Sequence, residues 1–154
     1  MTYAEGYKRL EQMRKEFLPQ VGSVMKEHRF EVFAAIDRIY EILNAACFKG
    51  LSGLEKERKK IMEGDAELEK ILLDGLDEDL MLELRNIHAM FVYYDKCERI
   101  LWQDFIFYIY IRGVMMMEVG IKPAFAVVML LSLLPEEDSH AMKKVMEKRG
   151  VKIY

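Results

Sequence analysis

Histidines and acidic residues are the groups in this sequence that could bind a metal ion or transfer protons. The three histidines are His28, His88 and His140, far apart and without a recognised ligand spacing. A di-iron carboxylate bundle needs Glu-x-x-His pairs, because that separation places both ligands on one helix face. Glu83 precedes His88 by five residues, which on a helix points the two side chains about 140° apart. We therefore predict no metal site and no cofactor.

The other acidic residues fit helix ends and turns better than a catalytic site. Asp74 and Asp77 are three residues apart, but Gly75 breaks the helix that would align their side chains. The acidic run at 136–138 could bind a cation, yet a helix N-terminus attracts acidic residues for electrostatic reasons alone. No glycine-rich phosphate loop and no nucleophile elbow occurs. We predict no catalytic residues; an all-helical enzyme built from scattered carboxylates is an alternative.

The composition is typical of a single packed domain. Of the 154 residues, 52% are hydrophobic and 32% charged, which is enough apolar surface for a continuous core. The 23 basic and 26 acidic residues leave a net charge of −3, without the basic excess that favours nucleic-acid binding. Cys47 and Cys97 lack metal or disulfide spacing, which favours a reducing compartment. We predict a cytoplasmic protein that does not bind nucleic acid.

Residues 101–134 are the most apolar part of the chain. A transmembrane helix needs about 20 nearly uncharged residues. Four charged residues interrupt this stretch: Asp104, Arg112, Glu118 and Lys122. The uncharged run that follows is too short to span a membrane, and the N-terminus lacks the apolar segment of a secretory signal. We expect buried core helices and no membrane insertion.

Helical patterns dominate the N-terminal part. We predict a polar first helix from about Tyr3 to Phe17, stopped by Pro19. A second helix is predicted from about Val21 to Lys49, with Gly50 at its left-handed C-terminal cap. The apolar face of this second helix is predicted to contain Phe33, Ile36, Tyr40, Leu43 and Cys47.

A third helix is predicted to begin at Ser52, because Ser52 and Glu55 have the spacing of a capping box. Leu54 begins its apolar face, while Arg58 and Lys59 belong to a charged run that points outward. Acidic residues alternate with the basic ones in this run. We interpret it as a solvated face, with a nucleic-acid patch as the alternative.

Helical patterns also follow Gly75, which ends a segment, and Asp77, which can cap the next helix. That helix continues to about Glu118, either as one long helix or as two with a bend near Gly113. Its aromatic and β-branched stretch Phe105–Ile111 could alone form a strand. No turn signals flank this stretch and no other credible strand exists to pair with it, so we predict a helix.

Glycine and proline mark the remaining helix boundaries. Gly120 and Pro123 predict a C-cap and the first residue of the next helix. A core helix over Ala124–Leu134 follows, and Pro135 begins a last, polar helix. The fold class is therefore predicted as all-α, a single-domain bundle of about five or six helices, two of them long.

Methionine and tyrosine clusters suggest packing or contacts with a partner. The run 115–117 covers most of a helical turn with methionines, which we interpret as core filling, with an adaptable binding groove as the alternative. Tyrosines around an indole favour an interface, either with a helical partner or with a second copy. They are Tyr93, Tyr94, Tyr108 and Tyr110, around Trp102.

Three segments of the sequence share their residue pattern and their order with a known family. They are Lys49–Glu57 (KGLSGLEKE), Asp74–Arg85 (DGLDEDLMLELR) and Ile111–Pro135. These blocks resemble the cytoplasmic segments of the flagellar stator subunit MotA and of its ion-channel relatives TolQ and ExbB. The family inserts two membrane helices between the later blocks, whereas charged residues occur here over Asn86–Gln103. The resemblance therefore implies a soluble relative that does not conduct ions.

The resemblance also implies a partner contact. Glu55 matches the family's acidic residue that faces the rotor, but the basic companion eight residues earlier is replaced by Cys47, which removes half of the charge complementarity. We assign partner binding to Glu55, Arg58 and Lys59, with capping and a solvated face as the alternatives. The residues that carry the structural motif are Gly50, Leu54, Gly75, Asp77, Gly113, Gly120, Pro123 and Pro135.

The sequence thus predicts a non-enzymatic helical module that binds a protein partner or itself. By resemblance it acts as an adaptor or regulator linked to motility. The alternative is a structural or phage-related helical homodimer, in which the resemblance is a coincidence of helix-breaking residues.

Overall fold

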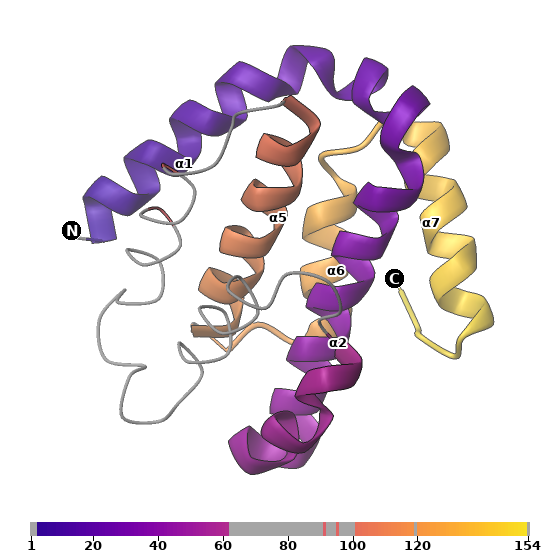
Figure 1. Cartoon of the computed structure of the whole chain (residues 1–154). Coiled ribbons are helices and arrows are strands. Elements are labelled where there is room, and N and C mark those ends of the chain that lie inside the picture. Colours follow the sequence, from indigo (N-terminus) through magenta and orange to yellow (C-terminus); the bar gives the residue numbers. More distant parts are fainter. Residues whose placement is uncertain (1–2, 62–90, 92–94, 96–100, 119, 154) are drawn as a thin grey trace.

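All regular secondary structure among the described residues of the computed structural model is helical (Figure 1). The structure describes residues 3–61, 91, 95, 101–118 and 120–153. The helices are α1 (Tyr3–Phe17), the 3₁₀ helix η1 (Leu18–Gln20), α2 (Val21–Ile61), α5 (Leu101–Glu118), α6 (Pro123–Leu131) and α7 (Glu136–Lys148). The all-α prediction is confirmed for these residues. The predicted total of five or six helices stays a prediction, because most of 62–100 lies outside the described residues.

The first two helices form an arch over α5 (Figure 1). α1 ends at Phe17, as predicted, and Pro19 lies in the single 3₁₀ turn that leads into α2. Proline is tolerated there because the first N–H groups of a helix have no intrahelical partner. Leu10, Met13 and Phe17 are buried, and their spacing confirms the amphipathic pattern of α1.

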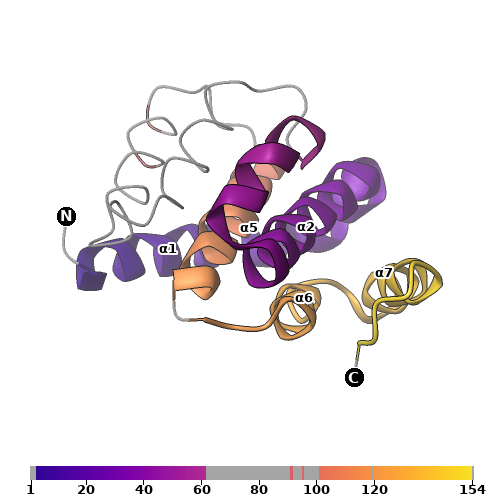
Figure 2. The same cartoon turned by 90° about the horizontal axis from the view of Figure 1, so that it is seen from below.

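α2 does not end at Gly50. It continues to Ile61 over 41 residues, so the predicted cap at Gly50 and the separate helix beginning at Ser52 are wrong. The last turns of α2, which contain Leu54, bend away from the axis of its first part in both views (Figures 1 and 2). Glycine tolerates helical dihedrals as well as left-handed ones, and Gly/Ser pairs favour bends. The Gly50-Leu51-Ser52-Gly53 sequence therefore favours a bend over a helix end.

The buried face of α2 is wider than predicted. Ile36 and Leu43 are buried as expected, but Cys47 is exposed, so its assignment to the apolar face is wrong. α2 contacts both α5 and α6, and a helix with two neighbours buries a broader stripe than one with a single seam. Phe33 and Tyr40 lie at the edge of this stripe and are half-buried. The stripe also includes Val32, Ala35, Ile39 and Ile42.

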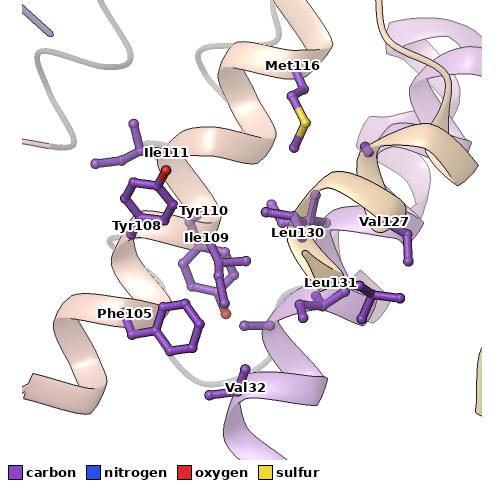
Figure 3. Close-up of a cluster of buried hydrophobic side chains, with 14 of the residues drawn as sticks. Val32, Phe105, Tyr108, Ile109, Tyr110, Ile111, Met116, Val127, Leu130 and Leu131 are labelled. Atoms are coloured by element: carbon purple, nitrogen blue, oxygen red, sulfur yellow. The ribbon is translucent and has the colours of Figure 1, made fainter. Parts of the chain in front are cut away.

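The aromatic stretch Phe105–Ile111 is helical and forms the centre of the core. α5 contacts α1, α2 and α6, and its side chains are buried on most sides. Figure 3 shows this cluster, in which α5 faces Leu130 and Leu131 of α6. Tyr108 and Tyr110 are buried here, so their predicted place at an interface is wrong. Met115 and Met116 are also buried, which confirms core filling.

Gly113 lies inside α5 and faces Ile39 of α2. No helix boundary occurs there, since α5 runs from Leu101 to Glu118. A Cβ atom at Gly113 would come within 2.5 Å of the Ile39 side chain. A glycine therefore suits the helix packing at this position, and of the two alternatives for this region the one with two helices meeting near Gly113 is wrong.

The predicted joint between α5 and α6 is confirmed. Gly120 has a φ of 74°, and the N–H of Ile121 bonds to the carbonyl of Met116 at 3.0 Å, as in a Schellman cap. Lys122 is extended, with φ −64° and ψ 145°, as the residue before a proline must be. Pro123 then begins α6.

The boundaries of the last two helices follow the predicted prolines and acidic residues. α6 ends at Leu131, three residues earlier than predicted, because the chain tightens into 3₁₀-type bonds such as Leu133 N–H to the Leu130 carbonyl. Pro135 caps α7, whose first turn is acidic. Gly150 has a φ of 85° and terminates α7.

Several predicted residues lie outside the described residues. Their assignments stay predictions; they are Gly75, Asp77, Glu83, His88, Tyr93, Tyr94 and Cys97. Among the helices that are described, none is both long enough and apolar enough to cross a bilayer.

We expect Gly113→Ala to lower the free energy of unfolding by about 1–3 kcal/mol, because the added methyl group overlaps Ile39 in a packed core. Gly22→Ala is the matched control, since nothing lies within 4 Å of a Cβ there. Removing a helical glycine at an open position should stabilise by about 0.5 kcal/mol. Urea unfolding measures both. Equal midpoints for the two variants would contradict the close contact.

Candidate interaction site

The predicted partner-binding residues lie in the last turns of α2. Glu55, Arg58 and Lys59 all belong to this helix, where separations of three and four residues put them along one face. The structure therefore confirms their helical setting. Their role in binding stays a prediction.

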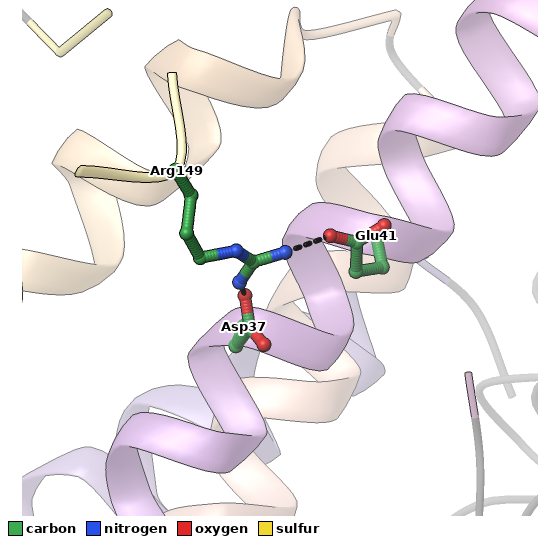
Figure 4. A network of polar contacts seen from close by, with 3 residues as sticks. All are labelled: Asp37, Glu41 and Arg149. Atoms are coloured by element: carbon green, nitrogen blue, oxygen red, sulfur yellow. Dashed lines mark hydrogen bonds and ion pairs between the residues drawn. The ribbon is translucent and has the colours of Figure 1, made fainter. Parts of the chain in front are cut away.

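One pronounced charge cluster links α2 to the C-terminal segment. The guanidinium of Arg149 donates to both Asp37 and Glu41 (Figure 4), which are one helical turn apart on α2. Partial burial lowers the pKa of Arg149, but the hydrogen bond and negative charge of Asp37, together with Glu41, outweigh this effect and raise it above its usual value. Arg149 therefore stays charged and pairs with two carboxylates at once.

A second ion pair joins α2 to the start of α7. The Nε of Arg29 lies 3.1 Å from Oδ1 of Asp138, although the alignment is not that of a hydrogen bond. The same guanidinium lies 5.2 Å from the ring centre of Phe33. α7 is thus tied to α2 near both of its ends, and the acidic run at 136–138 contributes Asp138 to an ion pair.

Arginine–tyrosine hydrogen bonds connect the other helices. Arg112 of α5 donates to the Tyr7 hydroxyl of α1 at 2.9 Å. Arg38 of α2 donates to the Tyr110 hydroxyl of α5 at 3.0 Å. These pairs lie at the edge of the core: the ring of Tyr110 is buried while its hydroxyl group reaches a charged partner, and Tyr7 is partly exposed. They stabilise the helix arrangement.

Arg9 of α1 anchors a further contact. It pairs with Asp95, and its guanidinium lies 4.3 Å from the ring centre of Phe91. This distance is within the range of a cation–π interaction. The contact links α1 to a part of the chain 86 residues away.

The two histidines among the described residues make separate contacts. His28 stacks on Trp102, with ring centres 4.3 Å apart and planes at 11°, and its Nδ1 is 3.5 Å from Glu31. His140 is exposed on α7, 3.8 Å from Glu136. Within the described residues, no three His, Cys, Asp or Glu side chains are grouped as metal ligands.

Exposed aromatic side chains form the feature that sequence reasoning missed. Phe30 on α2 is 84% exposed and Phe125 on α6 is 65% exposed. Met129 follows Phe125 by one helical turn and is also exposed, so these two residues form what we call the α6 outer face. The sequence contained a signal for this exposure, because Pro123–Leu131 is apolar on all sides. When other helices cover only one side of such a helix, its opposite side stays apolar and exposed.

Comparison with known proteins adds no assignment. No family model, curated protein or solved structure matches this chain. The likeness to stator segments therefore depends on the three sequence blocks alone and stays a prediction.

Burial of the Tyr108 side chain should make stability fall at alkaline pH. Burial raises its pKa above the usual value, and the charge of Arg112 offsets this only in part. The folded protein holds the proton more tightly than the unfolded chain. The contribution of protonated Tyr108 to the free energy of unfolding is thus intact below a pH of about 10. It is lost as the pH rises through the pKa that Tyr108 has in the folded protein.

We expect Tyr108→Phe to lose less unfolding free energy than the wild type between about pH 9 and pH 11, because the ionising group is gone. Urea unfolding followed by circular dichroism at several pH values measures the difference. Parallel pH curves for the two proteins would contradict a raised pKa of Tyr108.

Proposed function

We propose that this chain is a non-enzymatic, cytoplasmic helical module that binds another protein, as an adaptor or regulator linked to motility. The observation that supports binding most directly is the exposure of Phe30 and Phe125 on helices whose other sides form the core. The motility role is supported by the resemblance of three sequence blocks to the stator family.

The exposed phenylalanines favour association for a physical reason. Burying one such ring against a partner contributes about 1.5–3 kcal/mol, and aromatic side chains dominate many protein interfaces. Phe125 and Met129 present a pair of apolar side chains one helical turn apart, which suits a helix or a shallow apolar pocket. The core does not use these side chains, so a partner can cover them without unfolding the bundle.

The charged end of α2 supplies a second element of the proposal. By resemblance, Glu55 is the residue that would face a rotor protein, with Arg58 and Lys59 beside it. Cys47 stands where the family has a basic residue, and it is exposed. A thiol at this position cannot form the ion pairs of a guanidinium. We therefore expect partner binding to depend on the carboxylate of Glu55 and not on residue 47.

Affinity capture from a motile bacterial lysate tests the motility link. We expect the tagged full chain to recover stator or rotor proteins, Glu55→Lys to reduce this recovery by about tenfold, and Phe125→Ser to reduce it several-fold through lost apolar burial. Val145→Ser is the matched control, since Val145 is also exposed and apolar but lies on α7. Equal recovery of motor proteins with and without bait would refute the motility role.

The α6 outer face also favours a second candidate, a helical homodimer with a structural or phage-related role. Two copies could cover Phe125 and Met129 with each other, since identical patches meet in a two-fold dimer. Sedimentation at several concentrations tests this candidate, with Phe125→Ser expected to shift a dimer toward monomer. A wild-type chain that is monomeric at micromolar concentration would exclude an obligate dimer.

A further inference from the structure

The segment 136–153, comprising α7 and the residues after it, is attached to the bundle differently from the other helices. Only four of its apolar side chains are buried: Met142, Met146, Val151 and Ile153. α5, by contrast, is buried on most sides and contacts three helices. α7 also lies at an outer edge in both views, beside α2 and away from α1 (Figures 1 and 2).

Charge holds this segment at both ends. Near its beginning, Asp138 pairs with Arg29, and after its last turn Arg149 pairs with Asp37 and Glu41. The α2 residues follow the same order along the chain as their partners, so α7 runs parallel to α2, as Figure 1 shows. The paired side chains are mostly about one-third exposed, and Asp138 is the most covered. Salt therefore screens these pairs more than it weakens the apolar core.

We propose that residues 136–153 form a releasable clasp, which opens from α2 as a unit while α1, α2, α5 and α6 stay folded. Charge at the two ends and few buried apolar side chains give this segment a lower opening free energy than the core. The connection at 132–135 is short, but the segment follows the last core helix, so its release breaks no contact between the other helices.

Two aromatic rings of α2 lie close to the ion pairs of the clasp. Arg29 lies over Phe33, and the charge of Arg149 acts on Tyr40, so both half-buried rings lie near the clasp contacts. Phe30, which is already exposed, lies on an adjoining part of the same helix. This inference does not depend on the proposed function, since it concerns an equilibrium of the isolated chain.

Hydrogen exchange on the full chain tests the proposal. In Arg149→Glu, we expect amide exchange at Met142 and Met146 to rise about tenfold, while exchange in α5 changes less than about twofold. In the wild type, raising the salt concentration from about 0.05 M to 1 M should speed exchange in α7 and leave α5 unchanged. Lys148→Glu is the matched control, because it changes the same charge on the neighbouring residue without touching Asp37 or Glu41.

A charge-swapped variant separates release from general damage. Asp37→Lys and Glu41→Lys combined with Arg149→Glu restore opposite charges across the contact, so exchange in α7 should return toward the wild-type rate. The proposal is overturned if α7 and α5 amides exchange together, if Arg149→Glu leaves α7 protected, or if the swap fails to restore protection.

Discussion

The close approach of α5 to α2 at Gly113 is the constraint on which the rest of the fold depends. Ile39 occupies the space that any side chain at 113 would need, so the two backbones lie nearer than larger residues would allow. α5 is thereby placed against both α1 and α2, and it also contacts α6. An element enclosed in this way must be apolar around most of its circumference, which is the physical reason for the aromatic and β-branched stretch Phe105–Ile111.

Polar groups are used at the edges of this core. Tyr7 and Tyr110 accept hydrogen bonds from arginines on neighbouring helices, and Arg149 joins two carboxylates on α2. A charge inside the apolar centre would be costly to desolvate, whereas at the rim it keeps partial contact with water. The result is a graded structure, in which apolar packing dominates around α5 and charge contributes more toward α7.

This gradient bears on function. The core leaves Phe30 and Phe125 uncovered, and apolar side chains in water are available for a partner at little conformational cost to the bundle. The same outer region contains the charge-held segment 136–153. Binding and release are therefore proposed for the parts of the molecule that contribute least to its core, where a change of contacts leaves the central packing intact.

Local signals in the sequence determined the helical class, the ends of α1, and the joint at Gly120 and Pro123, because backbone restrictions and caps act within a few residues. Only the tertiary structure decided that α2 passes through Gly50, since glycine permits a helix end without requiring it. Tertiary packing likewise decided the exposure of Phe30 and the pairing of Arg149 with Asp37. Both depend on which helix faces lie together, and residues over a hundred positions apart carry no local mark of that contact.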